Sequence, residues 1–292
     1  MNARLTEAGR IAGTYHGELV IFNGQLRRIQ AHEGQLLSLL VDSKHIYTGG
    51  FDGYIRMRKY NGEKLAEKEI GHEVYGIAEH PKGLAIVDGD GRVYLADKEL
   101  KNVEQIYRYE EDRPARDVAV VYNYIVVGFY DGLIIALDSK GKIHRKIFRT
   151  LGDSVTYLGY NKELEAILAG FRSGRVSIIP VKTAEFTIRS GRSKKKIAIK
   201  PRTSLDLQTI GSVTRRVDIV EGSLLALGAN GKLYEQSLQR LINAALSTRG
   251  TRIVARHTHI LHEYGANGAH LEENTLITAG SDGFVRLRSV SV

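Results

Sequence analysis

The sequence predicts an all-β fold, a seven-bladed β-propeller of four-stranded antiparallel blades with one short helix in an insertion. Three observations support this prediction. One pattern of apolar runs and glycines occurs seven times in the 292 residues, most copies lie 36 to 42 residues apart, and a polar-Gly pair separates two β-rich runs in every copy. Four short strands with tight turns need about 40 residues, and repeated units of that size form the blades of a ring.

The seven copies align on a glycine that follows a polar residue. These anchor glycines are Gly17, Gly53, Gly91, Gly132, Gly174, Gly231 and Gly283, separated by 36, 38, 41, 42, 57 and 52 residues. The preceding residue is Asp, Asn, Ser or His, types that favour turns, and glycine adopts positive φ without steric cost. A second glycine stands three or four residues upstream in six copies. Each anchor therefore predicts a tight turn between the second and third strands of a blade.

The other strands of each unit follow from the runs around this turn. The run before it is apolar on both faces, as in AILAGF at 166–171, which predicts a strand buried between sheets. The run after it alternates, as a strand further out should. An apolar run precedes each hairpin and predicts the innermost strand, at 36–41, 74–78, 118–121, 155–158 and 213–220. A charged run often follows and predicts the outermost strand, at 25–30, 64–70, 103–107 and 143–148.

Closure of the ring depends on one N-terminal strand near Ala3 to Glu7. The last unit ends two strands past its first, shortly after Gly283. The first unit has only about ten residues before its second strand. The N-terminal strand either completes the last blade from outside or forms the inner strand of the first. We prefer the inner position, because a missing inner strand would leave a void at the channel. The chain is then one domain, 1–292, closed by non-covalent packing.

Two segments resemble blades of known propellers. GGFDGYIRMRKYNGE at 49–63 resembles the second and third strands of a WD40 blade, and VGFYDGLIIALDSKGK at 127–142 resembles a quinoprotein-type blade. The sequence is thus similar in repeat pattern, over nearly its whole length, to the WD40-like and quinoprotein-like propeller superfamily. It has no Trp, so the Trp-Asp dipeptide is absent. The Gly-His dipeptide that opens a WD40 blade occurs in place once, and the resemblance implies a structural His–Asp network only there, between His72 and Asp90.

Most of the net charge of +9 lies in one insertion, 189–202 (RSGRSKKKIAIKPR). Without its seven basic side chains the protein would hold 35 basic and 33 acidic residues. We expect a loop between a fourth strand and the next first strand, on the same face as Asp52, Asp131 and Asp282. The candidate residues for binding a nucleic-acid backbone or an acidic partner are Arg189, Arg192, Lys194, Lys195, Lys196, Lys200 and Arg202. The alternative is a solvated loop with no binding role.

A second insertion, 237–247, predicts the helix. Apolar residues in SLQRLINAAL recur at helical spacing along one stripe. As a connection from a third to a fourth strand, the helix should lie on the face opposite the basic insertion. It either covers that face of the propeller or docks into a groove of a partner, with the candidate docking residues Leu238, Leu241, Ile242 and Leu246.

The histidines after this helix are the only candidate metal ligands. His257 and His259 would point to the same side of a strand, and His262 is near. A structural or exposed role is the alternative, and we favour it. No cofactor is predicted.

No set of residues in the sequence amounts to a reaction mechanism. The lack of Cys excludes disulfides, Cys-ligated zinc, iron–sulfur clusters and a cysteine nucleophile, and no G-x-S-x-G, H-E-x-x-H or Walker sequence occurs. The segment Val118 to Leu137 is long enough for a membrane helix, but Asp131-Gly132 in it predicts a turn between two strands. The first residues lack the apolar stretch of a secretory signal. We expect a cytoplasmic protein without a membrane partner; the lack of Cys also suits a thermophilic source.

These observations predict a non-catalytic scaffold that assembles other proteins on a propeller. The alternative is a subunit of an RNA- or DNA-handling complex that contacts the phosphate backbone through 189–202. A third hypothesis is that the protein is an enzyme with its active site in the central channel.

Overall fold

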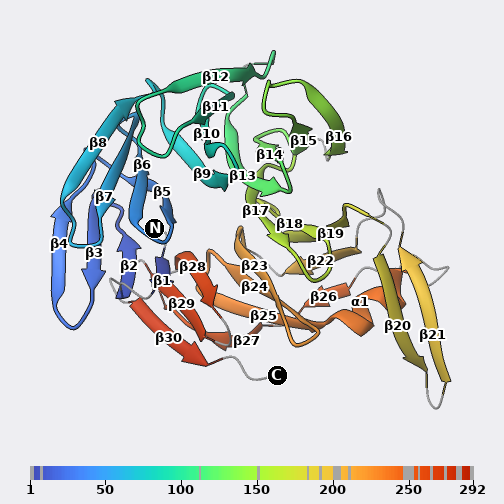
Figure 1. The fold of residues 1–292 in the computed structure, drawn as a ribbon. Helices are drawn as coiled ribbons and strands as arrows, with labels where there is room; N and C mark the ends of the chain where they lie inside the picture. Colours follow the sequence, from blue (N-terminus) through green and yellow to red (C-terminus); the bar gives the residue numbers. More distant parts are fainter. Residues whose placement is uncertain are drawn as a thin grey trace.

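The computed structural model describes residues 3–6, 9–111, 113–149, 152–182, 184–190, 193–199, 205–209, 212–245, 253–255, 257–263, 266–272, 275–280 and 285–289. These residues form antiparallel sheets arranged around a common centre, which Figure 1 shows in a view along that centre. The first strand of each sheet lies innermost, and the later strands follow outward.

The first four sheets each contain four consecutive strands. They are β1 (Ala3–Thr6), β2 (Gly9–Gly13), β3 (Glu18–Phe22) and β4 (Leu26–Gln30); β5 (Leu36–Val41), β6 (His45–Gly50), β7 (Tyr54–Lys59) and β8 (Lys64–Glu69); β9 (Val74–His80), β10 (Gly83–Asp88), β11 (Arg92–Ala96) and β12 (Val103–Arg108); and β13 (Ala115–Val121), β14 (Tyr124–Phe129), β15 (Leu133–Leu137) and β16 (Ile143–Arg149).

The later sheets include the insertions. The fifth contains β17 (Val155–Asn161), β18 (Ala166–Phe171), β19 (Arg175–Pro180), β22 (Leu205–Thr209) and β26 (Ile253–Ala255), and the sixth contains β23 (Thr214–Val220), β24 (Ser223–Gly228), β25 (Lys232–Ser237) and β27 (His257–Ile260). The seventh repeat forms β28 (Ala266–Glu272), β29 (Thr275–Gly280) and β30 (Val285–Ser289).

The prediction of seven four-stranded blades is wrong in its count. Among the described residues, six sheets have the four or more strands of a complete blade, and the seventh repeat forms a sheet of only three. The reason is the use of the N-terminal strand. β1 pairs with β2, from Ala3 opposite Ala12 to Thr6 opposite Gly9, so it is the inner strand of the first blade and does not add to β30. The preference for the inner position is thus confirmed.

The ring closes by packing between its first and last sheets. β1 lies beside β5 on one side and beside β28 on the other, and β23 lies between β17 and β28. No covalent link joins the first sheet to the last in the described part of the chain, so closure depends on strands that pack face to face across the seam.

The apolar cores lie between neighbouring sheets. Between the second and third blades, for example, Tyr47, Ile55, Leu84 and Ile86 are fully buried. The second strands β10, β18 and β24 are buried along their whole length, as their two-sided apolar runs predict, whereas the outer strand β8 is mostly exposed. Residues 118–137 form part of β13 and all of β14 and β15, and no helix among the described residues is long and apolar enough to cross a membrane.

The anchor glycines adopt the backbone that the repeat pattern predicts. The six in the described residues (Gly17, Gly53, Gly91, Gly132, Gly174 and Gly231) have φ between +73° and +87°. At Gly231 a Cβ atom would also lie 2.0 Å from the carbonyl oxygen of His262. Glycine is therefore required there both by conformation and by space.

The glycine upstream of the anchor sets the distance between blades. A Cβ atom on Gly128 would lie 2.5 Å from Val155 Cγ1, the first residue of the next inner strand. Gly49 meets Val74 in the same way, at 2.5 Å. The missing side chain lets the next blade pack against the backbone of the second strand, which explains why this glycine recurs.

The two insertions occupy the same kind of position. The segment expected as a basic loop forms a hairpin, β20 (Ala184–Ser190) with β21 (Ser193–Ile199), that stands between the third strand β19 and the fourth strand β22. The helix α1 (Leu238–Ala245) likewise follows the third strand β25 and precedes the fourth strand β27. After α1, β26 adds to the fifth sheet as a parallel partner of β22.

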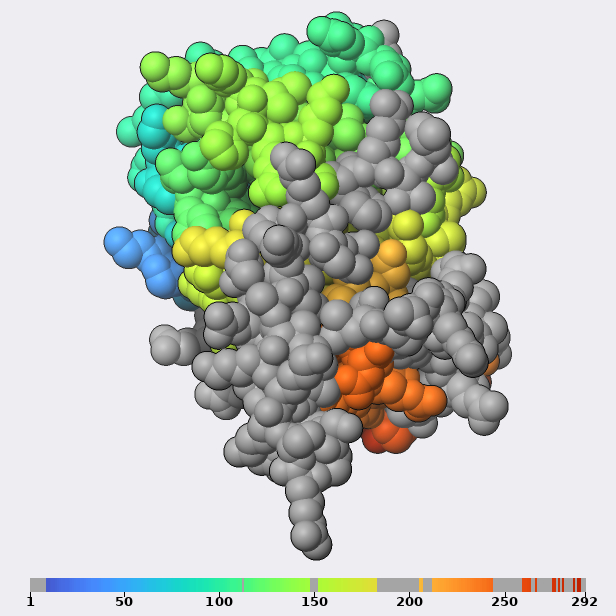
Figure 2. All heavy atoms as spheres, turned by 90° about the vertical axis from the view of Figure 1, so that its right-hand side faces the viewer, coloured from blue at the N-terminus to red at the C-terminus, as the bar shows by residue number. Residues whose placement is uncertain are grey.

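The predicted face of the basic insertion is therefore wrong, whereas the helix connects a third to a fourth strand as predicted. A connection from a third to a fourth strand lies opposite the turns that carry Asp52 and Asp131, so the hairpin does not share their face. The helix and the hairpin lie on the same side, where α1 neighbours β20. Figure 2 views the molecule from the right-hand edge of Figure 1, with described residues of the fourth and fifth blades above those of the sixth repeat in orange. The error arose because β22, not β20, is the strand that pairs with β19.

Candidate functional site at the channel mouth

Five inner strands carry the same irregularity near their start. In β5, β9, β13, β17 and β23 one residue is skipped in the pairing with the second strand, which is the pattern of a β-bulge. The skipped residues are Leu37, Tyr75, Arg116, Thr156 and Arg215, which we call the bulge ring. β28 has the same shift at Asn267. Because a bulge re-aims a side chain, these residues are turned to the centre of the propeller.

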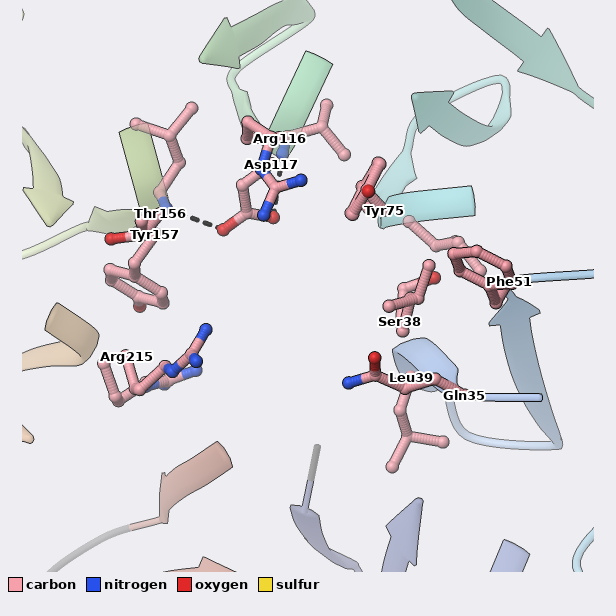
Figure 3. Close-up of a pocket in the computed structure, with 16 residues that line it drawn as sticks. Gln35, Ser38, Leu39, Phe51, Tyr75, Arg116, Asp117, Thr156, Tyr157 and Arg215 are labelled. Atoms are coloured by element: carbon pink, nitrogen blue, oxygen red, sulfur yellow. Dashed lines mark hydrogen bonds between the residues drawn. The ribbon is translucent and has the colours of Figure 1, made fainter. Parts of the chain in front are cut away.

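The bulge ring lines a pocket of about 370 Å³ in the central channel. Gln35, Ser38, Phe51, Asp117 and Tyr157 complete much of its wall. Figure 3 shows these side chains arranged around one open space, with Arg116 and Arg215 on two different strands. The pocket is thus built from five blades, and no single blade could form it.

Basic groups dominate the electrostatics of this pocket. The guanidinium of Arg116 lies over the ring of Tyr75, 4.1 Å from its centroid. Burial lowers the pKa of Arg215, and the positive charge of Arg116 lowers it further. Arg216 is different, because it donates two hydrogen bonds to Asp218, at 2.7 and 3.1 Å. Burial opposes the charged form of Arg216, but Tyr157 and Asp218 outweigh it and raise the pKa.

The rim around the pocket carries exposed aromatic side chains. Tyr15, Phe51 and Tyr130 stand two residues before their anchor glycines, on the turns between second and third strands, and are 62%, 55% and 40% exposed. Arg172 holds the equivalent place in the fifth blade and donates a hydrogen bond to the Tyr130 hydroxyl, at 2.9 Å. Aromatic rings on rigid turns are typical of protein-binding surfaces.

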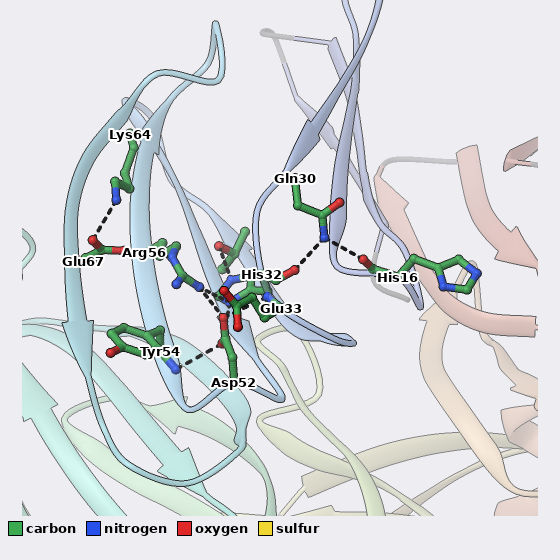
Figure 4. A network of polar contacts seen from close by, with 10 residues as sticks. His16, Gln30, His32, Glu33, Asp52, Tyr54, Arg56, Lys64 and Glu67 are labelled. Carbon is green, nitrogen blue, oxygen red and sulfur yellow. Dashed lines mark hydrogen bonds and ion pairs between the residues drawn. The ribbon is translucent and has the colours of Figure 1, made fainter.

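A buried polar network supports the rim below Phe51. His32 Nδ1 lies 2.9 Å from Asp52 Oδ1, and His32 Nε2 lies 2.8 Å from the Thr48 hydroxyl. Arg56 Nη1 donates to Asp52 Oδ2 at 2.7 Å and also lies 2.6 Å from His32 Nδ1. Figure 4 shows how these groups join the end of β4 to β6 and β7. The network fixes the turn that presents Phe51.

Burial and charge act in opposite directions on the network. Burial lowers the pKa of His32, and nearby arginines add to this effect against the carboxylate of Asp52. Burial also works against ionised Asp52, but hydrogen bonds from Arg56 and His32 outweigh it and lower the pKa of that carboxyl. The favoured state at neutral pH is a neutral imidazole beside an ionised Asp52.

The His–Asp network expected at His72 is in a different blade. His72 Nε2 lies 3.9 Å from Asp90 Oδ2, and the His72 side chain is 44% exposed, so this contact is a loose surface pair. Asp90 pairs instead with Arg92 and Arg108. The Gly-His dipeptide misled the prediction, because His32, the buried histidine beside a turn aspartate, follows Ala31 and not a glycine.

The last repeat contains a second network of the same form. His262 Nε2 lies 2.8 Å from the Thr278 hydroxyl, and Arg286 Nη1 lies 2.5 Å from His262 Nδ1. His32 and His262 each precede their threonine by 16 residues. That shared spacing is the sequence signal that could have located both networks.

Two of the three candidate metal ligands, His259 and His262, each contact an arginine side chain. His259 Nε2 lies 2.8 Å from Arg288 Nη2, and His262 is held by Thr278 and Arg286. Guanidinium groups beside both imidazoles disfavour a metal cation. No group of three His, Cys, Asp or Glu side chains suited to a metal is present in the described part of the chain, and the side chain of His257 lies outside it.

The candidate docking helix faces its own protein. Leu238, Leu241 and Ile242 are 7%, 2% and 3% exposed and pack with Tyr157, Val217 and other core residues between the fifth and sixth blades. The amphipathic stripe is correctly predicted, but it covers the propeller and does not face a partner. Leu246 lies outside the described residues.

The basic insertion is only partly described. Lys194, Lys195 and Lys196 lie on β21, and Lys194 pairs with Arg189 of β20. Arg192, Lys200 and Arg202 lie outside the described residues. The hairpin stands apart from the bulge ring, since it branches from the outer side of the fifth blade.

Comparison with solved structures identifies the fold. The β-propeller domain of Cps50 (Swd1) from Myceliophteria thermophila is 14% identical, covers 99% of this chain and 96% of its own, and superposes with a TM-score of 0.74. The WD40 β-propeller domain of Doa1 is 13% identical, the match covers 97% of this chain and 90% of Doa1's, and the TM-score is 0.70. The computationally designed Ika8 protein is 14% identical, the match covers 99% of this chain and 95% of Ika8's, and the TM-score is 0.68. No protein-family model and no curated protein matches the sequence. The chain therefore has a WD40-like β-propeller fold.

Proposed function

We propose that this WD40-like propeller is a non-catalytic scaffold that binds partner proteins on the rim around its channel. The observation that carries the proposal is the exposure of Tyr15, Phe51 and Tyr130 on equivalent turns of three blades. Large aromatic rings supply contact area at a small cost in conformational entropy, and they dominate the energetics of many protein interfaces.

The rigidity of the rim supports the proposal. The Phe51 turn is held by Asp52, which accepts hydrogen bonds from the backbone N–H groups of Glu33 and Tyr54, at 3.0 and 3.3 Å. The Tyr130 hydroxyl is held by Arg172. A preorganised surface loses less entropy when a partner binds. Propellers serve many functions, so the fold alone does not select this one.

A pull-down from the native host tests the proposal, with a variant pair on opposite faces. Phe51→Glu with Tyr130→Glu places two charges on the rim, whereas Tyr122→Glu changes an equally exposed tyrosine, 48% exposed, on the turn between β13 and β14 on the other face. We expect the rim variant to lose specific partners that the wild type and Tyr122→Glu retain. Loss of the same partners only in Tyr122→Glu would move the interface to the other face and refute the proposal.

A second proposal is contact with the phosphate backbone of RNA or DNA. Its support is the concentration of charge at the end of the β20–β21 hairpin, where Lys194 and Arg189 are paired in register. Replacing Lys194, Lys195 and Lys196 by Glu should abolish salt-dependent retention on RNA or heparin. Unchanged retention in that triple variant would remove the hairpin as the binding element.

A further inference from the structure

The bulge positions hold basic but no acidic residues. They hold Leu37, Tyr75, Arg116, Thr156 and Arg215, with Asn267 at the same register position in β28. Two of the six are arginine and none is acidic, although acidic residues are abundant elsewhere. The five bulges of the bulge ring therefore bring two positive charges and no negative charge to one pocket.

Neither arginine has an acidic partner in the part of the chain that the structure describes. Among the described residues, no carboxylate lies within ion-pair distance of Arg116 or Arg215, whereas Arg216 pairs with Asp218 and Arg56 pairs with Asp52 and Glu67. The stack of Arg116 on Tyr75 orients its guanidinium but leaves its charge uncompensated.

The one acidic side chain in the pocket wall is already engaged. Asp117 Oδ2 accepts a hydrogen bond from the backbone N–H of Leu158 at 2.7 Å, and its Oδ1 accepts one from the N–H of Val118 at 2.9 Å. Asp117 thus ties β13 to β17. An anion that enters the pocket would find two guanidinium groups, which form charge-assisted hydrogen bonds with anions.

The pocket opens towards the aromatic rim. Phe51 belongs both to the pocket wall and to the exposed rim. A volume of about 370 Å³ has room for one or two amino-acid side chains. A protein segment that rests on the rim could therefore reach the two arginines.

We infer that the channel mouth binds carboxylate side chains of an acidic segment in a partner protein, with Arg116 and Arg215 as the charged contacts. The inference rests on the proposed scaffold function and names the chemistry of its partner. Charge complementarity selects this occupant: the pocket presents two guanidinium groups that have no carboxylate partner among the described residues, and their fork geometry matches carboxylates.

Fluorescence anisotropy with a labelled hexaglutamate peptide tests the inference, at about 0.15 M ionic strength. Hexaglutamine is the uncharged probe. The variant Arg116→Gln with Arg215→Gln should weaken hexaglutamate binding about tenfold to a hundredfold, as expected for loss of charge-assisted hydrogen bonds. The control Arg27→Gln with Arg28→Gln removes the same net charge from the outer strand β4 and should leave binding unchanged.

The conservative variant Arg116→Lys with Arg215→Lys guards against an effect on folding. It keeps both charges but loses the planar fork, so its affinity should lie between those of the wild type and the Gln variant. Equal binding of hexaglutamate and hexaglutamine, or equal weakening by the β4 control, would overturn the inference. The inference would also be overturned if hexaglutamate did not bind while inorganic phosphate bound in a way that depends on the two arginines. That result would assign the pocket to a small phosphate ligand.

The two proposals fail in different ways. If hexaglutamate does not bind but Phe51→Glu with Tyr130→Glu still loses host partners, the scaffold stands and the acidic-segment inference falls. If hexaglutamate binds through the arginines but the rim variant loses no partner, the rim proposal falls.

Discussion

Replacing Asp52 by alanine should destabilise the propeller by about 3 kcal/mol, at the lower end of the range for removing one partner of a buried ion pair. The Asp52 side chain is 9% exposed, and it accepts hydrogen bonds from Arg56 at 2.7 Å and from the Glu33 backbone N–H at 3.0 Å, with His32 Nδ1 at 2.9 Å. Its removal leaves the buried His32 without this partner. Arg56 keeps Glu67 at 3.0 Å, and for that reason we expect the lower end of the range.

Asp90 provides the matched control, because it also precedes an anchor glycine. Its carboxylate is 21% exposed and pairs with Arg92 and Arg108, whose side chains are 23% and 47% exposed. Ion pairs of this kind contribute about 0 to 1 kcal/mol, so Asp90→Ala should cost no more than about 1 kcal/mol. Both substitutions remove an acidic turn residue, so the difference between them isolates the buried network.

Urea unfolding followed by circular dichroism or tyrosine fluorescence measures the difference, since the chain has 15 Tyr and no Trp. The shift in the unfolding midpoint multiplied by a common m-value gives the change in free energy. Equal midpoints for Asp52→Ala and Asp90→Ala would refute the assignment of a stabilising buried network to the second blade.

Three further outcomes are expected. Leu241→Ala should cost about 2–5 kcal/mol in urea unfolding because the helix stripe is core, whereas Gln239→Ala on the outer side of α1 should be neutral; equal neutrality would restore the docking helix. Gly128→Ala should cost about 1–3 kcal/mol because its Cβ atom meets Val155, and an unchanged midpoint would show that the blades can separate slightly. Burial lowers the pKa of His32 on folding, so its contribution to stability is complete above its ordinary pKa of 6.5 and is lost as the pH falls through the folded pKa. Midpoints measured from pH 7 to pH 5 should fall, and a flat profile would contradict a buried neutral imidazole.

The local parts of the fold were accessible from the sequence. A turn that requires positive φ leaves a glycine in the sequence, so the anchors predicted the hairpins, and the buried second strands followed from two-sided apolar runs such as 166–171. The helix of the second insertion was predicted from its stripe, with α1 at Leu238–Ala245. These features depend on residues within a few positions of one another.

The functional residues depended on pairing between strands. Arg116 and Arg215 reach the channel because each is skipped in a register shift, and a single sequence does not mark which residue a bulge will skip. His32 was missed because it follows Ala31, whereas the WD40 dipeptide has glycine before the histidine. The spacing of 16 residues to Thr48, repeated from His262 to Thr278, would have been a better guide.

By itself, the sequence determined that four-stranded units repeat and where each unit turns, since turn chemistry and strand periodicity are local properties. Only the tertiary structure decided that β1 is the inner strand of the first blade, that β22 and not β20 completes the fifth, and that α1 faces the core. The physical reason is that several runs in the chain have equal intrinsic strand character. Which of them pair is set by packing across blades far apart in the sequence, and that packing also brings Arg116 and Arg215 to one pocket.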